Sequence, residues 1–211
     1  SHGGLSVGED GATHQCIEDL NNMRVLPGMT VVVPCGGHEM TLATEALLNL
    51  NGPSYLRLGR MAVDNVTDEM PGYKFELGKG VTMRSGGDVT VIACGLMVQE
   101  ALKAADIMAA EGVSVRVIDM HTIKPLDEAL VLQAARETGA IVTSEEHSIV
   151  GGLGAAVCEY LSQACPVPVV RHGVEDCFGR SGPAKKVLAA YGLTAEGLAE
   201  KVRLAVSLKN R

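Results

Sequence analysis

The opening stretch of the chain, from His2 to Gln15, gathers side chains that can do chemistry. It holds two histidines, two adjacent carboxylates and four glycines. Glycine lets a backbone turn sharply and approach a ligand closely, while histidine and aspartate move protons and hydrogen-bond to polar substrates. A surface connection is the plainer interpretation, but a simple connection rarely needs so many special residues. This stretch is therefore the first candidate site.

Asp10 and His14 are the reactive pair within it. They are four residues apart, and a helix is expected to begin near Thr13, so they share one face if the turn between them is helical. The partial positive charge of a helix N-terminus would add to the site. Such a site could hold a sugar hydroxyl between a carboxylate and an imidazole.

Arg60 is the second candidate. It follows Gly59 at the predicted end of a strand, where a guanidinium could bind a phosphate through two hydrogen bonds. Arg57 lies on the same face of that strand and is a rival for this role. A solvated arginine is the plainer alternative for either residue.

Two further strand ends carry polar residues. Glu145-Glu146-His147 lies in a predicted strand-to-helix loop before Gly151-Gly152-Leu153-Gly154, a loose match to a dinucleotide-binding loop. These glycines come too late after the strand, and Val157 stands where a small residue is required. We therefore interpret them as structural and assign no role to the three polar residues. The segment from Asp119 to Pro125 is more typical of a turn than of a catalytic site.

The composition argues against several classes of function. The chain has 211 residues, 46% of them apolar, a formal net charge of -7 and a pI near 5.4, which disfavours nucleic acid and anionic membranes as partners. No signal peptide or membrane-spanning apolar run is visible. Without CxxC spacing, the cysteines are expected to be small buried side chains of a cytoplasmic protein rather than disulfides or a zinc site. They are Cys16, Cys35, Cys94, Cys158, Cys165 and Cys177.

Alternating strands and helices must position these residues. Short apolar strands followed by helices of about ten to fifteen residues are typical of parallel βαβ units. The first series predicts a helix at about 13–27, strands at 30–33 and 55–58, and a helix at 40–50. The second predicts strands at 89–93, 113–118, 140–143 and 167–170, helices at 98–111, 126–138 and 153–163, and tail helices that begin near Pro183 and Thr194.

The predicted fold class is therefore α/β, with two units in series. Residues 1–62 form an incomplete α/β domain, residues 63–86 a linker, and residues 87–211 a complete domain with a mostly parallel sheet. The chain opens inside a motif with no strand or helix before it, so we interpret it as the later portion of something longer.

These motifs resemble those of transketolases. The stretch Gly8-Glu9-Asp10-Gly11-Ala12-Thr13-His14-Gln15 is similar to the substrate-binding loop of that family. The resemblance covers essentially the whole chain, as the end of a pyrimidine-binding domain followed by a C-terminal domain. The sequence of the opening motif is most similar to that of the C-terminal subunit of split transketolases, in which two polypeptides together form one enzyme. The other similar segments are Arg24 to Pro34, Gly52 to Arg60, Ile118 to Asp127 and Thr143 to His147.

The resemblance implies a reaction and a set of roles. A transketolase uses thiamine diphosphate to move a two-carbon ketol unit from a ketose phosphate to an aldose phosphate. By similarity, His2 and Arg60 contact the donor phosphate, Asp10 binds the C2 hydroxyl of the acceptor, and His14 lies beside the reacting groups. His2 and His14 are thus the catalytic candidates. The implied setting is a cytoplasmic homodimer or heterotetramer of the pentose phosphate pathway.

The chain departs from the family pattern in two ways. Gly3-Gly4 replaces Asp-Ser after the first histidine, and Cys35-Gly36-Gly37-His38 replaces a more usual Ala-Asp-Ala type of sequence. The family's glutamate that activates the cofactor, its aromatic platform and its diphosphate and magnesium site should lie upstream of Ser1 or on an N-terminal partner polypeptide. No cofactor-binding residue or metal ligand is therefore assigned here, and the chain alone is predicted to be inactive.

Other functions stay open at this stage. The nearest are 1-deoxyxylulose-5-phosphate synthase and the beta-type subunit of a 2-oxo acid dehydrogenase, although Asp10 together with His14 favours transketolase over both. A non-catalytic module that stabilises a dimer is the alternative from a different class. The sequence does not indicate which sugar phosphates are used.

Overall fold

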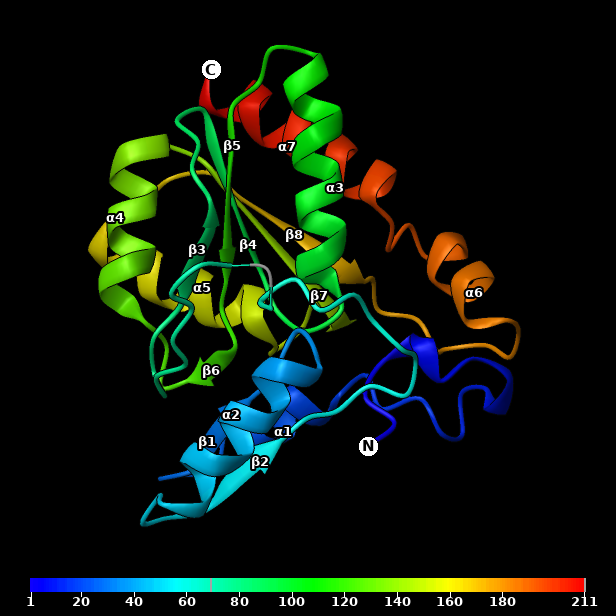
Figure 1. The fold of residues 1–211 in the computed structure, drawn as a ribbon. Helices are drawn as coiled ribbons and strands as arrows, with labels where there is room; N and C mark the ends of the chain where they lie inside the picture. Colours follow the sequence, from blue (N-terminus) through cyan, green and yellow to red (C-terminus); the bar gives the residue numbers. More distant parts are fainter. Residues whose placement is uncertain (69, 211) are drawn as a thin grey trace.

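The computed structural model describes residues 1–68 and 70–210 and contains two sheets. The larger sheet has the strand order β3-β5-β4-β7-β8 and the smaller one the order β2-β1-β6. In the larger sheet β4, β5, β7 and β8 are parallel and β3 is an antiparallel edge (Figure 1). The predicted α/β class with a mostly parallel sheet is confirmed. The strands of the larger sheet are β3 (Val81–Arg84), β4 (Val89–Ala93), β5 (Val115–Asp119), β7 (Ile141–Ser148) and β8 (Val169–Val174).

Helices cover both faces of the larger sheet because its central strands are apolar on both sides. In β4, Val91 packs into the core formed with α3 (Met97–Ala110) and α7 (Ala195–Lys209). The neighbouring Ile92 packs into the core formed with α4 (Glu128–Thr138) and α5 (Leu153–Ala164). Alternate residues of the same strand therefore anchor opposite layers, which Figure 1 shows as helices on either side of the sheet.

The smaller sheet joins residues from both halves of the chain. Strand β1 (Thr30–Val32) pairs in parallel with β2 (Ser54–Leu56) and antiparallel with β6 (Thr122–Lys124). Lys124 Nζ donates to the carbonyl oxygens of Arg24 and Leu26 at 2.7 and 2.6 Å, at the end of α1. A cation at a helix C-terminus binds carbonyls that have no partner in the helix. The other elements here are η1 (Leu5–Asp10), α1 (Asp19–Arg24) and α2 (Gly37–Leu48).

The first predicted helix begins later than expected. It starts at Asp19 instead of near Thr13, because the backbone of Cys16 is hydrogen-bonded to the opening residues and the buried Gln15 amide donates to the carbonyl of Arg180 at 3.0 Å. The turn between Asp10 and His14 is therefore not part of that helix, and the condition for the two residues to share one helical face is not met. Tertiary hydrogen bonds use the backbone groups that a helix would need.

The third parallel strand is longer than expected. It was predicted to end at Thr143, but β7 continues to Ser148, so Glu145, Glu146 and His147 lie in a strand and not in a loop. All three are buried. Buried ionisable residues in a strand are uncommon unless they have partners, and the partners here come from distant segments.

The cysteines only partly match the expected burial. Cys35 and Cys94 are buried, but Cys16 and Cys177 are exposed and the remaining two are intermediate. None of the helices among the described residues has the length and apolar character needed to cross a bilayer. The tail helices begin where expected: α6 (Ala184–Ala190) follows Pro183, and the Thr194 side chain accepts from Gly197 N at the start of α7.

The two-sided core gives the first prediction. Replacing Ile92, which is fully buried, with alanine (Ile92→Ala) should lower the free energy of unfolding by about 2–5 kcal/mol, since it removes packed methyl groups and leaves a cavity. The matched change Leu48→Ala, at a side chain that is 81% exposed, should change it by less than about 0.5 kcal/mol. Urea unfolding followed by circular dichroism measures both. Equal effects would contradict the core assignment.

Candidate active site

The opening residues lie between two segments from elsewhere in the chain. On one side Gly4 N donates to Cys16 O at 2.7 Å, and Cys16 N donates to His2 O at 3.1 Å. On the other side Gly3 N donates to Leu58 O at 3.0 Å. These backbone bonds fix the position of the opening residues far more tightly than a free surface loop would be fixed.

The four predicted substrate-binding residues gather on this surface as two pairs. The rings of His2 and His14 are 6.2 Å apart between centroids. Arg60 donates to the carboxylate of Asp10, and their side chains are 51% and 37% exposed. We name these four residues the rim cluster. Their roles toward a substrate remain predictions, but their side chains are accessible to one.

Arg57, the predicted rival of Arg60, is not available to a phosphate. Its Nε donates to Asp19 Oδ2 at 2.8 Å, and its Nη2 donates to the carbonyls of Cys16 and Glu146 at 2.8 and 3.0 Å. The side chain is 6% exposed. Burial acts to raise the pKa of Asp19, but the guanidinium outweighs it and the pKa is lowered. Arg57 therefore joins three segments instead of binding substrate.

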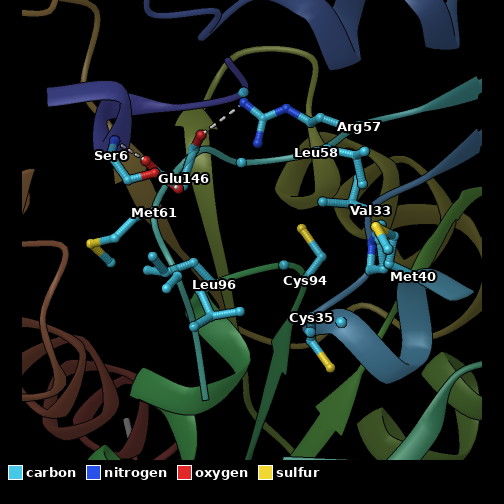
Figure 2. A pocket seen from close by; sticks show the side chains of 18 of the residues that line it. Ser6, Val33, Cys35, Met40, Arg57, Leu58, Met61, Cys94, Leu96 and Glu146 are labelled. Carbon is cyan, nitrogen blue, oxygen red and sulfur yellow. Dashed lines mark hydrogen bonds between the residues drawn. The ribbon is translucent and has the colours of Figure 1, made fainter. Parts of the chain in front are cut away.

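Glu146 explains the glycine at position 4. The Ser6 backbone N–H and its hydroxyl both donate to the Glu146 carboxylate (Figure 2). Gly4 has a φ of 86°, and a Cβ there would overlap that carboxylate. A glycine is thus required both by the backbone conformation and by the space that Glu146 occupies. The departure from the family pattern at this position has a direct structural cause.

A cavity of about 350 Å³ is lined in part by Gly3 and Gly59, the sequence neighbours of His2 and Arg60. Its walls include Cys94 to Leu96, in the connection that leaves β4, and Glu146 on β7 (Figure 2). The chain leaves these adjacent parallel strands for helices on opposite faces of the sheet, α3 after β4 and α5 after β7. Such a reversal point is where open α/β sheets bind ligands. The small sheet and the N-terminus of α2 close the other side.

The glycine-rich segment after β7 binds a carboxylate of the protein itself. Leu153 N and Gly154 N, at the start of α5, donate to the Glu145 side chain at 2.7 and 2.8 Å. Burial raises the pKa of Glu145 to about 7, although these N–H groups oppose the shift. The helix N-terminus that a dinucleotide would use is therefore already occupied, and the structural interpretation of these glycines fits the contacts.

His147 is held as a neutral imidazole. Its Nε2 accepts from Leu20 N at 3.2 Å, so the proton is on Nδ1, which donates to Ser148 O at 2.7 Å. Burial, together with the nearby Arg57 charge, lowers the pKa of His147 to about 4. A second proton would displace the Leu20 N–H, so the histidine ties α1 to β7 only in its neutral form.

The segment from Asp119 to Pro125, which the sequence suggested was a turn, is not a simple turn. Asp119 ends β5, and its carboxyl lies near Cys35 and Glu39 in a fully buried group. Sequence spacing does not reveal this group, because its members come from different elements. The network of Arg57, Glu146 and Asp19 was not predicted from the sequence for the same reason. Three adjacent ionisable residues in β7 were nevertheless a signal that could have revealed part of it.

The cavity does not fit the diphosphate of a thiamine cofactor. Among the described residues that line it, Arg57 is the one cation, and its Nε and Nη2 are already bound to Asp19 and to carbonyls, with its charge balanced by Asp19. A diphosphate needs cations or a metal ion to balance its charge. The part of this chain that the structure describes therefore supplies walls of the cavity and the rim cluster, without an anchor for that group.

Both halves of the chain match domains of one class of enzyme. The profile described as transketolase, pyrimidine binding domain, matches residues 1–65, and that described as transketolase, C-terminal domain, matches residues 78–198. The second profile alone spans more than half of the chain. The chain belongs to the transketolase family.

Similar proteins extend beyond this chain. A 6-deoxy-6-sulfo-D-fructose transketolase subunit from a Clostridium species is 42% identical over 98% of this chain and 64% of its own length. The 1-deoxy-D-xylulose-5-phosphate synthase of Syntrophotalea carbinolica is 39% identical over 95% of this chain and 32% of its own. A solved structure described as a split gene transketolase, inactive beta4 tetramer, has a TM-score of 0.87 and 45% identity, covering 94% of this chain and 64% of that chain. The chain thus spans less than two thirds of each of these relatives.

Replacing the buried Arg57 and the exposed Arg60 should have very different effects on the free energy of unfolding. Arg57→Ala leaves Asp19 as a buried carboxylate without its partner, so the free energy of unfolding should fall by about 3–5 kcal/mol. Arg60→Ala removes a half-exposed pair and should cost less than about 1 kcal/mol. Denaturant titration of both variants at neutral pH tests this. A tolerated Arg57→Ala change would mean that Arg57 is not a structural anchor.

The lowered pKa of His147 should make the stability of the protein depend on pH. Its pKa of about 4 in the folded state lies below the ordinary 6.5, so the unfolded state binds more protons between these values. The contribution is full above about pH 6.5 and is lost as the pH falls toward 4, by about 3 kcal/mol in total. His147→Gln should remove most of that difference between pH 7 and pH 4.5, as measured by urea unfolding. The exposed His14→Gln change is the control and should retain it; identical curves for both variants would refute the assignment.

Proposed function

We propose that this chain forms part of a thiamine diphosphate-dependent transketolase that transfers a two-carbon ketol unit between sugar phosphates. The observation that carries the proposal is the rim cluster. Backbone hydrogen bonds bring together segments that are distant in sequence, and four polar side chains suited to a phosphorylated sugar project there. Gly3 and Gly59, next to His2 and Arg60 in sequence, line a cavity at the reversal point of the sheet, which supports a ligand-binding role.

Each member of the rim cluster has a proposed task. Arg60 and His2 bind the substrate phosphate, for which a guanidinium offers two parallel donors. Asp10 accepts a hydrogen bond from the acceptor's C2 hydroxyl, and His14 exchanges protons beside the reacting carbonyl. In the absence of substrate Asp10 and Arg60 satisfy each other. A sugar phosphate would separate this exposed ion pair at small cost, because such pairs contribute about 0–1 kcal/mol.

The cofactor is proposed to lie mainly on other residues. Bound thiamine diphosphate supplies the carbanion chemistry of ketol transfer, and a magnesium ion would balance its diphosphate. We assign both to an N-terminal polypeptide or domain. Two similar proteins support a shared enzyme, one named as a subunit and the other described as a split gene transketolase in an inactive beta4 tetramer. We further propose a homodimeric or heterotetrameric assembly in the cytoplasm that serves sugar-phosphate metabolism.

A second function has specific support from one relative. The similarity to 1-deoxy-D-xylulose-5-phosphate synthase covers 95% of this chain. Assays of the reconstituted assembly for 1-deoxyxylulose 5-phosphate and for ketol transfer distinguish the two enzymes. The domain boundaries near residues 62 and 87 remain part of the proposal, because β6 crosses between the halves.

Substrate selection should depend on Asp10. A hydrogen bond to a charged carboxylate contributes about 1.5–3 kcal/mol, so Asp10→Ala in the assembly should lower kcat/KM about 10- to 100-fold for aldoses with the correct C2 hydroxyl. Aldoses without that hydroxyl should lose much less. The neighbouring exposed carboxylate offers a matched control, Glu9→Ala, which should leave the selectivity unchanged. Equal losses for both kinds of aldose would make Asp10 a structural residue.

The chain by itself should show no ketol transfer and weak or no binding of thiamine diphosphate. Addition of an N-terminal transketolase polypeptide that carries the diphosphate-binding domain should restore both, as measured by a coupled assay and by isothermal titration. The physical reason is the missing anchor for the diphosphate. Turnover by the purified chain alone would refute the shared-site proposal.

A further inference from the structure

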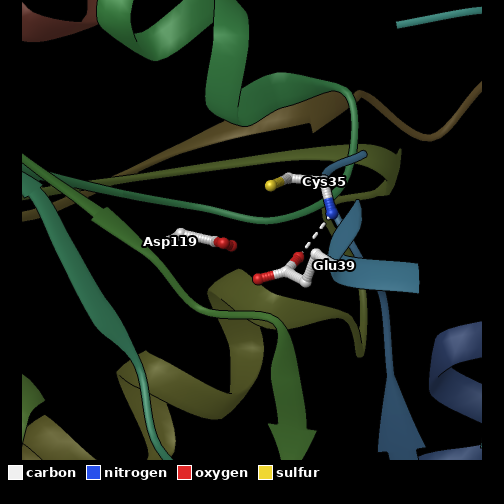
Figure 3. A group of neighbouring side chains, drawn as sticks. All are labelled: Cys35, Glu39 and Asp119. Atoms are coloured by element: carbon white, nitrogen blue, oxygen red, sulfur yellow. Dashed lines mark hydrogen bonds between the residues drawn. The ribbon is translucent and has the colours of Figure 1, made fainter. Parts of the chain in front are cut away.

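A buried group of three side chains lies apart from the rim cluster, where the two sheets meet. Cys35 precedes α2, Glu39 lies in the first turn of α2, and Asp119 ends β5. One ligand atom from each, the Cys35 Sγ and a carboxylate oxygen of each acid, lies within 4.8 Å of the others. Figure 3 shows the thiol and the two carboxyl groups directed toward a common space. All three residues are at most 2% exposed.

Asp119 is the observation that indicates a ligand. It is fully buried, and neither of its carboxyl oxygens has a hydrogen-bond partner among the described residues. The nearby Glu39 carboxylate is well supported, since it accepts from the Cys35 backbone N–H at 2.6 Å and from the Tyr73 hydroxyl. A buried carboxyl group normally has partners, so Asp119 directs two unused acceptors into the space that it shares with Cys35 and Glu39.

We propose that Cys35, Glu39 and Asp119 bind a divalent transition-metal ion of the zinc type. A thiolate and two carboxylates form a donor set that zinc accepts, and three protein ligands leave a fourth position for water. The sulfur ligand disfavours magnesium and calcium, which prefer oxygen alone. Binding releases the proton of the Cys35 thiol and any proton held between the carboxyl groups. The dication then neutralises two of the three negative charges of the donor set, which apolar surroundings could not tolerate without a cation.

The position of the group gives the ion a structural task and a route of entry. Glu39 belongs to the layer of the small sheet and Asp119 to the larger sheet, so one ion would link them. Cys35 also forms part of the wall of the 350 Å³ cavity, and in Figure 2 its sulfur turns away from the cavity center. The cavity is therefore the side from which an ion would approach the group. The site is independent of the proposed ketol transfer.

A shared proton is the competing explanation. Two carboxyl groups this close cannot both be ionised in a buried site without a cation, and one proton between Asp119 and Glu39 would remove the repulsion. The two explanations differ in the thiol, which takes no part in a carboxyl–carboxylate pair but must bind a zinc-type ion. The two explanations also predict different results for Asp119→Asn. The asparagine amide can donate to Glu39 as a shared proton would, but it cannot serve as an anionic metal ligand.

The test uses cobalt as a spectroscopic substitute for zinc in the full chain. After treatment with a chelator, the protein should bind one equivalent of Co²⁺, with tetrahedral d–d bands and a near-ultraviolet sulfur-to-cobalt charge-transfer band, and Zn²⁺ should displace it. Cys35→Ser should lose the charge-transfer band and bind at least tenfold more weakly. Cys165→Ser, at a partly buried cysteine outside the cavity lining, is the control and should keep both the charge-transfer band and the affinity.

Two results would overturn the proposal. The first is a cobalt spectrum that survives in Cys35→Ser, since the ion would then be elsewhere. The second is a folded chain that binds no Co²⁺ or Zn²⁺ above background, which would establish the shared proton instead. The Asp119→Asn variant separates loss of metal binding from misfolding, because the neutral amide removes the repulsion between residue 119 and Glu39. That variant should remain folded by circular dichroism while its melting temperature no longer rises with added Zn²⁺.

Discussion

The buried guanidinium of Arg57 is the contact on which the arrangement of the two halves depends. It comes from the strand end of the small sheet, and its donors meet a carboxylate at the start of α1 and carbonyls of the opening segment and of β7. An arginine can satisfy several such acceptors at once because its donors form a rigid planar fork. The charge is tolerable in the interior only because Asp19 balances it. The backbone around Cys16 therefore has one position relative to the larger sheet.

This constraint separates the polar residues into an interior set and a surface set. The interior set, which includes Asp19, Glu145, Glu146 and His147, makes its hydrogen bonds to other groups of the protein. The surface set is the rim cluster, whose members make exposed contacts. Residues of the first set hold the chain segments in place, and residues of the second remain free to exchange their partners for a ligand. The same residue types thus have opposite functions according to burial.

The sequence predicted most of the regular elements but not the interior network, and the roles of the rim cluster remain predictions. Strand β4 and helices α3, α4 and α5 follow from apolar periodicity, a local property. The family resemblance located the rim residues by motif. The start of α1 was wrong because Gln15 and Cys16 bond to segments that local patterns do not reveal. The extent of β7 was missed because Glu145 and His147 are polar residues whose burial depends on partners in other elements. Asp119 was assigned to a turn, since nothing near it in sequence indicates Cys35 or Glu39.

The shared small sheet has a consequence for how the protein folds. Strand β1 and its parallel partner β2 are synthesised close together, but β6 follows only after β4 and β5 have been synthesised. Until then one edge of β1 presents unpaired backbone groups, and such edges promote association between chains. Pairing across this sequence distance is also intrinsically slow. The interval between the synthesis of β1 and that of β6 is therefore the stage at which aggregation competes with folding, and pairing of β6 with β1 ends that exposure.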